Sequence, residues 1–333
     1  MALTDPTTAA SLTGPAAASL TDPAAASLTG AQVAALAAGV EAGDPDELLV
    51  VVGPTASGKT ALAIELARRF DGEVIGVDSV QVYRRFDLGS GKPDAAERAR
   101  APYHLVDVVD PLAPLDAGSF GEMARATIAA VRARGRRPVL CGGTFLWVKA
   151  TVEGLADAAP ASAAVRERLA AEASAHGAAA LHERLAAVDP VSAARLHPND
   201  VLRVSRALEV HELTGERLSE LHARHQSRPP LFRTRLVGLA WPRDVLGARI
   251  AARTAGWLSA GWVDEVRALC ADGYRDSRAM GSVGYRQVLD HVEGRLPASD
   301  LALAIDRATR VFVRRQMTWL RDEPVQWLTA PVA

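Results

Sequence analysis

Cysteines, lysines and long apolar runs are all scarce in this chain of 333 residues. The two cysteines, Cys141 and Cys270, lack the spacing of a metal or redox pair, which predicts buried small hydrophobes in a reducing cytoplasm. No apolar run approaches the roughly 18 residues that a membrane-spanning helix needs. The first residues have neither a positive start nor an apolar block, so we expect no secretory signal. With a net charge of −1 the chain has no global field for nucleic acid, and any such binding requires a local patch.

The N-terminal segment differs in composition from the rest of the chain. Ser-Leu-Thr recurs at 11–13, 19–21 and 27–29, with alanine-rich spacers and repeated Pro and Gly between them. Segments with so little bulky apolar content cannot repay the entropy lost on ordering. We therefore predict a disordered low-complexity tail over residues 1–45, although a short helix is compatible with residues 32–40.

The clearest local signal is a glycine-rich loop, Gly53-Pro54-Thr55-Ala56-Ser57-Gly58-Lys59-Thr60, which fits the phosphate-binding pattern G-x-x-x-x-G-K-[ST]. A continuous apolar run at 48–52 precedes it, typical of a strand buried on both faces, and a run of helical composition at 61–69 follows. Such a unit directs several backbone N–H groups and a helix N-terminus at one point, where a phosphate chain fits. We expect Lys59 to meet the terminal phosphate and the Thr60 hydroxyl to ligate magnesium.

Further strands are predicted at 72–78, 104–110 and 136–142, alternating with helices, which indicates a parallel α/β sheet with helices on both faces. The second of the chain's strands ends in Asp78, and groups at the carboxyl ends of such strands face the ligand crevice. Asp78 is therefore a magnesium-linked carboxylate, a general base, or the N-cap of a helix at 79–83. Gly142, Gly143 and Thr144 form a second turn at which backbone can approach a phosphate.

Residues 160–226 show helical patterns throughout, and a strand pattern returns at 235–241. This predicts a P-loop-type α/β core at 46–154 and 233–330, with an all-helical insertion at 155–232. Within the insertion, Arg203 and Arg206 lie one turn apart and either grip phosphates or form a solvated helix face, while His211 is expected to be packed. The helix predicted at 301–321 carries a basic stripe that is suited to nucleic acid.

Six signature segments occur in order along the chain. They are the loop at 53–60, then Asp78-Ser79-Val80-Gln81-Val82-Tyr83-Arg84, Gly142-Gly143-Thr144, Asn199-Asp200 with Arg203 and Arg206-Ala207-Leu208-Glu209-Val210, Val283-Gly284-Tyr285-Arg286, and Arg314-Arg315-Gln316-Met317-Thr318-Trp319-Leu320-Arg321. In this order they resemble the bacterial tRNA dimethylallyltransferases, also called tRNA isopentenyltransferases. The resemblance covers residues 48–328 and is far more specific than the phosphate loop alone.

The resemblance implies transfer of a dimethylallyl group from dimethylallyl diphosphate to tRNA. The acceptor would be the exocyclic amine (N6) of the adenosine just 3′ of the anticodon in tRNAs reading U-initial codons, giving N6-isopentenyladenosine. In this family the phosphate loop holds the diphosphate of the donor, and no nucleoside triphosphate is cleaved. Asp78 aligns with the family's catalytic aspartate, which accepts the proton of the amine. Thr144 and Arg166 would sit beside the reacting nucleotide, Arg166 on the short match Val165-Arg166 alone.

Other expectations follow from matching positions. A magnesium cofactor, a monomeric state and a cytoplasmic location are implied. The implied tRNA contacts are Asp78, Ser79, Val80, Gln81, Leu202, Arg203, Val204, Ser205, Arg206, Gly284, Tyr285 and Arg286. The chain departs from the family pattern at Ser90-Gly91-Lys92, at Phe145-Leu146-Trp147 and at Leu202, which often is glutamine and here removes a hydrogen bond to RNA.

Three other hypotheses stay open at this point. An adenylate isopentenyltransferase of the cytokinin type would prenylate free adenine nucleotides, although the helical insertion and the arginine pairs favour tRNA. A small-molecule kinase would share the phosphate loop and transfer a phosphoryl group from ATP. A nucleotide-gated RNA-binding module would carry no chemistry at all, so that losing the Asp78 carboxylate would leave its function intact.

Overall fold

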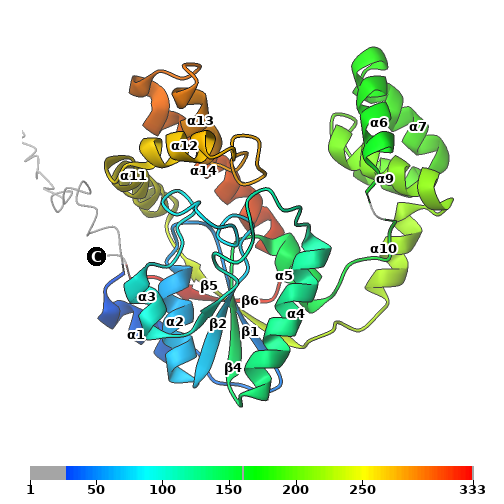
Figure 1. The fold of residues 1–333 in the computed structure, drawn as a ribbon. Helices are drawn as coiled ribbons and strands as arrows, with labels where there is room; N and C mark the ends of the chain where they lie inside the picture. The colour runs from blue at the N-terminus through cyan, green and yellow to red at the C-terminus, as the bar shows by residue number, and fades with distance from the viewer. Residues whose placement is uncertain (1–27, 160, 332–333) are drawn as a thin grey trace, which may run out of the picture. The chain divides into compact units, whose positions relative to one another are not determined.

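The computed structural model of the chain describes residues 28–159 and 161–331. A six-stranded sheet, in which all strands run parallel, forms the core of the larger of two compact units (Figure 1). Its strands are β1 (Leu48–Val52), β2 (Gly72–Gly76), β3 (Tyr103–His104), β4 (Arg137–Cys141), β5 (Thr234–Ala240) and β6 (Val325–Thr329). They lie in the order β3-β2-β4-β1-β5-β6. The predicted parallel α/β fold is confirmed.

The larger unit, called unit 1 below, comprises residues 28–115, 123–147 and 234–331 of the described chain. Its helices are α1 (Gly30–Ala38), α2 (Lys59–Arg69), α3 (Ala95–Arg100), α11 (Arg243–Ser259), α12 (Trp262–Ala271), α13 (Tyr285–Val292) and α14 (Ala298–Leu320). Two helices, α4 (Ala117–Ala133) and α5 (Phe145–Val152), carry the chain between the units. In the part of the chain that the structure describes, no helix is long and apolar enough to cross a membrane.

Unit 2 is helical and comprises Asp116–Glu122 and Val148–Arg233, apart from residue 160. Its remaining helices are α6 (Ala163–His176), α7 (Ala178–Val188), α8 (Pro190–Arg195), α9 (Val201–Thr214) and α10 (Leu218–Gln226). It extends beyond the insertion predicted at 155–232, because it also takes in 116–122 and 148–154. Its own core holds Leu169, Leu181, Leu185, Val204 and Leu208.

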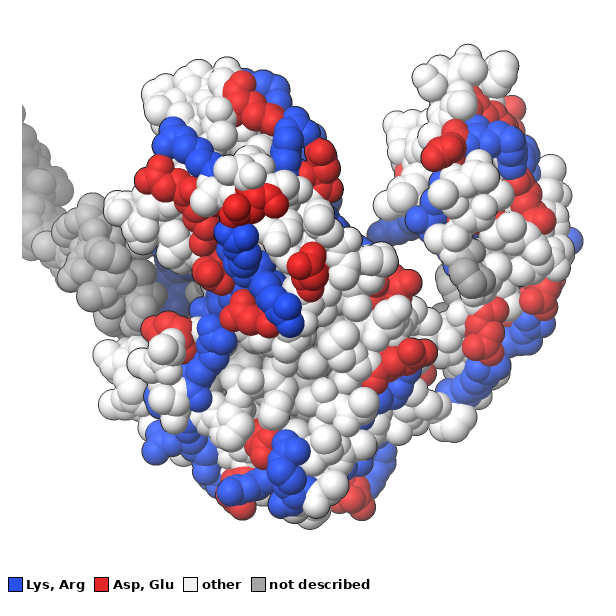
Figure 2. All heavy atoms as spheres, viewed as in Figure 1, with Lys and Arg blue, Asp and Glu red and all other residues white. Residues whose placement is uncertain are grey.

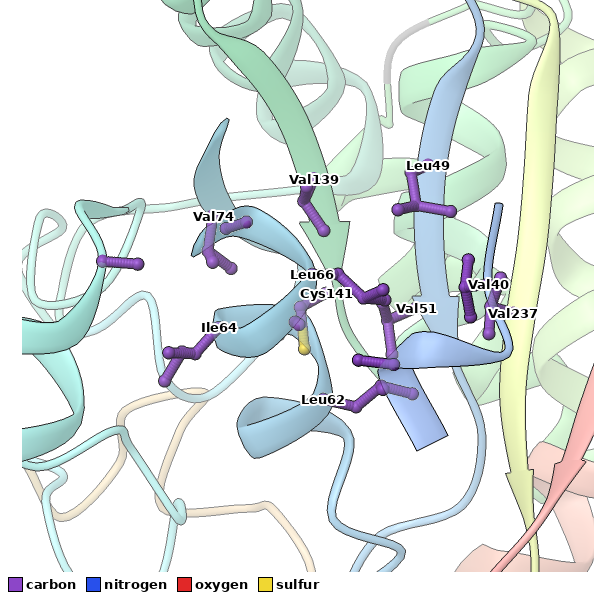
Figure 3. Close-up of a cluster of buried hydrophobic side chains, with 14 of the residues drawn as sticks. Val40, Leu49, Val51, Leu62, Ile64, Leu66, Val74, Val139, Cys141 and Val237 are labelled. Atoms are coloured by element: carbon purple, nitrogen blue, oxygen red, sulfur yellow. The ribbon is translucent and has the colours of Figure 1, made fainter. Parts of the chain in front are cut away.

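The core of unit 1 explains why its strands are continuous apolar runs. Every residue of β1 is buried, because the sheet is covered on both faces. Figure 3 shows Val51 of β1 and Cys141 of β4 among side chains of α2, Leu62 and Leu66. Each fully buried aliphatic side chain of this size contributes about 1.5–3 kcal/mol. The phosphate loop therefore leaves the sheet from its most buried strand.

The structure corrects the prediction of a disordered tail up to residue 45. Residues 1–27 lie outside the described residues, but α1 forms at Gly30–Ala38, with Thr29 and Gln32 in a capping box. Val33 and Ala37 are buried, and α1 packs against α2. The basic end of α2 also reaches α1, because the Arg69 guanidinium donates to the carbonyl oxygen of Ala37. The alanine-rich composition of this segment did not indicate that one apolar face of α1 packs against α2.

Two local predictions were wrong and one strand was missed, each because of tertiary pairing. Residues 79–83 form a turn rather than a helix, because Tyr83 pairs in parallel with Val109 and the carbonyl of Val82 accepts from two N–H groups of that segment. The strand predicted at 104–110 shortens to β3 for the same reason. The edge strand β6 was not predicted, since its partly exposed residues do not alternate between apolar and polar and its partner, β5, lies far away in sequence.

Candidate active site: a cationic cavity at the phosphate loop

The loop between β1 and α2 has the backbone shape of an anion cradle. Three of its residues have positive φ, Gly53 at 136°, Ala56 at 64° and Gly58 at 94°. The α2 helix begins at Lys59, so its first N–H groups lack intrahelical partners and face the loop with the positive end of the helix dipole. The Nζ of Lys59 donates to the carbonyl oxygen of Pro54, 2.8 Å away. A loop of this form binds phosphate groups.

A cavity of about 370 Å³ opens at this loop, within unit 1. The order of the strands builds it, because β2, β4 and β1 are neighbours and their carboxyl ends meet at one edge of the sheet. The loop after β1, the turn after β2 and the double glycine after β4 all contribute to the lining. These contributions are Thr55, Ala56, Gly58, Lys59 and Thr60, then Asp78 and Gln81, then Gly142 and Gly143. Of the predicted loop residues, Gly53, Pro54 and Ser57 do not line it.

Two arginines of α11, which also line the cavity, bind the phosphate loop. Arg249 donates from Nε to the carbonyl oxygen of Ala56 at 2.9 Å, and Arg253 donates from Nη2 to the hydroxyl of Thr55 at 2.8 Å. Trp241, just after β5, donates from Nε1 to the carbonyl of Ser57 at 2.8 Å. None of the three was predicted from the sequence. The available signal for the two arginines was their spacing, four residues apart on one face of α11.

The cavity is strongly cationic. Lys59, Arg249 and Arg253 line it, and Asp78 is the only acidic residue among the described residues that do. Burial lowers the pKa of Lys59 to about 8, with Arg253 adding to the drop and Cys141 and Asp78 opposing it. Burial also lowers the pKa of Arg253 to about 10. Confined cations whose charge is costly without a partner indicate an anionic ligand.

One carboxylate oxygen of Asp78 is hydrogen-bonded, and the other has no hydrogen-bond partner among the described residues. Its Oδ1 accepts from the N–H groups of Val80 at 2.9 Å and Gln81 at 3.2 Å, which is a cap-like contact made to a turn, because the helix expected at 79–83 does not form. No hydrogen bond reaches Oδ2 from the described residues. Thr144 supports the same turn, since its hydroxyl accepts from the Ser79 N–H at 3.1 Å. The turn thus holds a rigidly oriented carboxylate at the cavity, while Thr144 itself does not line it.

The double glycine has a packing role besides the one predicted. A Cβ on Gly142 would overlap the backbone carbonyl of Val77, and one on Gly143 would overlap the side chain of Gln316. The two glycines thus permit protein packing, in addition to lining the cavity. Gln316, from α14, accepts from the Thr55 N–H at 2.9 Å and donates to the Gly143 carbonyl at 3.0 Å. It was part of a signature segment, but no pattern in the sequence indicated that it bridges two loops.

Of the residues predicted to contact tRNA in unit 1, Tyr285 does not present its side chain. Its ring is fully buried and its hydroxyl donates to Glu265 Oε1 at 2.6 Å. Gly284, whose φ is 94°, packs under Trp262, whereas Arg286 is exposed. Ser79 and Val80 are half-buried. Gln81 is half-buried too, and its amide donates to the carbonyls of Ser90 and Gly91, which ties the 88–91 loop to the Asp78 turn.

Two of the predicted residues in unit 2 share one buried carboxylate. Arg166 and Arg206 both donate to Glu209, whose side chain is fully buried. Burial alone would raise the pKa of Glu209, but hydrogen bonds from Arg206, the Ser162 N–H and Arg166 outweigh it and lower that pKa. The pairing gives Arg166 a structural partner within its own unit.

The other predicted residues of α9 divide by face. Val204 lies in the core of unit 2, so its side chain does not reach a ligand, which corrects its assignment as a tRNA contact. Leu202 is 81% exposed, Ser205 is half-buried, and Arg203 is exposed and paired with Asp200 at 3.1 Å. His211 is half-buried next to the buried residues of α9, with a buried Nδ1 that has no partner among the described residues.

The donor set for a cation is sparse. Among the described residues, no group of three or more His, Cys, Asp or Glu side chains gathers to hold a metal. Thr60 lines the cavity and can supply a hydroxyl oxygen. That set fits a magnesium ion held mainly by water and by phosphate oxygens of a ligand, as is usual for Mg²⁺.

The outer surface carries charges of both signs. On the face shown in Figure 2, Lys and Arg are interspersed with Asp and Glu over both units. This agrees with the net charge of −1, and the concentration of cations in the cavity is therefore a local feature.

Two family descriptions match the chain. One, described as IPP transferase, matches residues 81–323, and the other, isopentenyl transferase, matches residues 46–102. Among curated proteins, the chain is 63% identical to a tRNA dimethylallyltransferase of Sorangium cellulosum over 86% of this chain and 91% of that one. A protein of the same name from Geobacter metallireducens is 43% identical, over 85% of this chain and 93% of its own.

Solved structures with a similar fold include enzymes described by related names. The tRNA isopentenylpyrophosphate transferase of Bacillus halodurans matches with a TM-score of 0.63 and 35% identity, over 86% of this chain and 90% of that one. A eukaryotic dimethylallyltransferase acting on tRNA matches with a TM-score of 0.71 over 85% of this chain and 74% of that one. At 24% identity the second match supports the fold alone.

Proposed function

The chain belongs to the tRNA dimethylallyltransferase family, and we propose that it transfers the dimethylallyl group of dimethylallyl diphosphate to tRNA. The acceptor is the N6 amine of the adenosine 3′ of the anticodon in tRNAs reading U-initial codons. The amine nitrogen forms a bond to C1 of the donor, and the bond between C1 and the diphosphate oxygen breaks. Pyrophosphate leaves with the bonding electrons, and the amine loses one proton. The observation that carries this proposal is that the phosphate loop and Asp78 line the same cavity.

The cationic end of the cavity is suited to the leaving group. Lys59, the loop N–H groups and Arg253 would hold the diphosphate, and their charge stabilises the negative charge that grows on it as the C1–O bond breaks. Thr60 would hold a magnesium ion, which supplies further positive charge to the diphosphate when bound. Because Arg249 and Arg253 already hold the loop, little reorganisation is needed on binding.

Asp78 is the proposed general base. Its Oδ1 is held by two N–H groups, so the second oxygen has a defined direction from which to accept the proton of N6. General-base help of this kind contributes about 10²–10⁴-fold to a rate. The adenosine lies in a single-stranded loop of tRNA, so its base can leave the stack to reach the cavity.

The tRNA contacts are proposed for the exposed predicted residues, namely Arg203 and Leu202 on α9 and Arg286 on α13, with the Ser79–Gln81 turn at the cavity. Arg166 is proposed to act from unit 2, where Glu209 orients it. We also propose that the chain works as a monomer in the cytoplasm, where unmodified tRNA is made.

The test is incubation with dimethylallyl diphosphate and unmodified tRNA, followed by nucleoside analysis. Prenylated adenosine in tRNA, with AMP left unmodified under the same conditions, is the expected result. No prenylated adenosine would refute the proposal, and prenylated AMP without prenylated tRNA would favour the adenylate-acceptor alternative.

The Asp78→Asn substitution removes the proposed general base while preserving the local fold. An asparagine keeps an oxygen for the N–H groups of Val80 and Gln81, so the turn should persist while turnover falls about 10²–10⁴-fold. Asp110→Asn is the matched control, because Asp110 Oδ1 accepts from the Leu112 N–H in a turn outside the cavity. Equal losses in both variants, or none in Asp78→Asn, would remove Asp78 from the mechanism.

A further inference from the structure

Along one face of α11 the side chains that line the cavity change from cationic to aromatic. Arg249, Arg253 and Trp257 follow at intervals of four residues, and all three line the cavity. The two arginines contact the phosphate loop, whereas Trp257 packs against Gly91 in the loop after the Asp78 turn. At 1.5 Å per residue, the backbone of Trp257 lies about 6 Å further along the helix axis than that of Arg253. The cavity therefore runs from cations at the loop to an aromatic side chain beyond them.

Three packing contacts hold the Trp257 ring. The guanidinium carbon of Arg253 lies 4.5 Å from its centroid, and the Trp262 ring meets it edge-on at 5.4 Å. A Cβ on Gly91 would come within 3.3 Å of the indole, so that loop passes directly against it. Gln81 ties the same loop to the Asp78 turn. An indole held in this way cannot swing aside cheaply to lengthen the cavity.

Phe312 gives the cavity a second aromatic side chain. It lies on α14 one turn before Gln316, which bonds to the phosphate loop, and α14 packs on α11. With the diphosphate at the loop, the hydrocarbon chain of a donor would lie toward Phe312 and Trp257. A chain one isoprene unit longer would need the space that the indole fills.

We propose that Trp257 is a specificity-determining residue that limits the donor to a five-carbon prenyl chain. This rests on the proposed function, since it assumes an allylic diphosphate whose phosphates occupy the loop. The indole also positions Arg253, but that effect applies to the diphosphate of any donor and cancels when two donors are compared.

The test compares dimethylallyl diphosphate with geranyl diphosphate, which has ten carbons. Their dissociation constants are measured by calorimetry without tRNA, and their transfer to unmodified tRNA is measured separately. Wild type should prefer the five-carbon donor, and Trp257→Ala should shift the ratio toward geranyl diphosphate by about tenfold or more. Trp257→Leu, which keeps an apolar side chain of smaller size, should shift it in the same direction.

The control is Trp262→Phe, because Trp262 does not line the cavity and a phenylalanine keeps an aromatic ring against Trp257. Its donor ratio should match that of wild type. The proposal is overturned if wild type accepts both donors equally, if neither Trp257 variant shifts the binding ratio beyond about threefold, or if Trp262→Phe shifts it as much. If wild type binds the donors yet prenylates no tRNA, the proposed function fails while the binding ratio still decides the role of Trp257.

Discussion

Replacing Gln316 tests whether one side chain holds two catalytic loops in register. Gln316 is 6% exposed and joins the Thr55 N–H of the phosphate loop to the Gly143 carbonyl after β4. Gln316→Leu keeps the volume and removes both hydrogen bonds. Each backbone group left unpaired costs about 1–3 kcal/mol, but both residues line the cavity, where water can partly replace the amide. We therefore expect a loss of about 2 kcal/mol in the free energy of unfolding.

The same substitution should weaken donor binding. Without the bridge, the Thr55 N–H is free to turn away from its place in the loop, and the Arg253 contact to the Thr55 hydroxyl is disturbed with it. A binding loss of about 2 kcal/mol corresponds to roughly thirtyfold in the dissociation constant. Urea unfolding and calorimetry with dimethylallyl diphosphate measure the two effects separately.

Two variants make the outcome decisive. Gln316→Glu retains an acceptor for Thr55 but places an oxygen against the Gly143 carbonyl, so it should recover only part of the loss. Gln326→Leu removes a comparable amide from an exposed site, where it donates to the Gly39 carbonyl, and should cost little. If Gln316→Leu lowers stability while leaving donor affinity unchanged, the bridge is structural only and the reasoning about loop register is refuted.

Three further predictions concern single sites. Because burial lowers the pKa of Lys59 to about 8, the lysine is charged below that pH and loses its proton above it. Donor affinity should then fall by up to about tenfold per pH unit above pH 8, and calorimetry against Lys59→Met, whose profile lacks this step, measures it. Gly142→Ala should destabilise by about 3 kcal/mol or more in urea, because its methyl group overlaps the Val77 carbonyl, and a mild effect would show that β2 and β4 can separate. Val33→Asp should release α1 to limited proteolysis, whereas Ala34→Asp on the exposed face should not, and equal protection would contradict the docking of α1.

The sequence predicted a structural feature correctly where residues that are neighbours in sequence are sufficient to form it. The apolar run of β1, the glycines of the phosphate loop and the start of α2 are adjacent in sequence, so their pattern predicted the cradle and its position. Asp78 was placed correctly at the carboxyl end of a strand, because in parallel sheets such ends share one edge. The capping alternative for Asp78 anticipated the N–H groups that Oδ1 accepts from, but these belong to a turn rather than to a helix, and the turn engages only one of the two oxygens.

The same local rules failed where contact with a segment distant in sequence determines the local structure or the burial of a side chain. Residues 79–83 could form a helix by themselves, but pairing of Tyr83 with Val109 made a turn. Tyr285 belongs to a signature segment and was assigned to tRNA, although the structure buries it against Glu265. Val204 shares its segment with Arg203, and only the packing of unit 2 separates the buried face from the exposed one.

The amino-acid sequence by itself determined the alternation of strands and helices, the phosphate cradle, the identity of the acid beside it and the family to which the chain belongs. These depend on short spacings and on ordered signatures. Tertiary structure alone decided that Arg249 and Arg253 clamp the loop, that Gln316 bridges it to β4 and that Trp257 lies beyond them in the same cavity. The physical reason is that these contacts join α11 and α14 to loops about 170–260 residues away in sequence, and only the strand order brings them to one edge of the sheet.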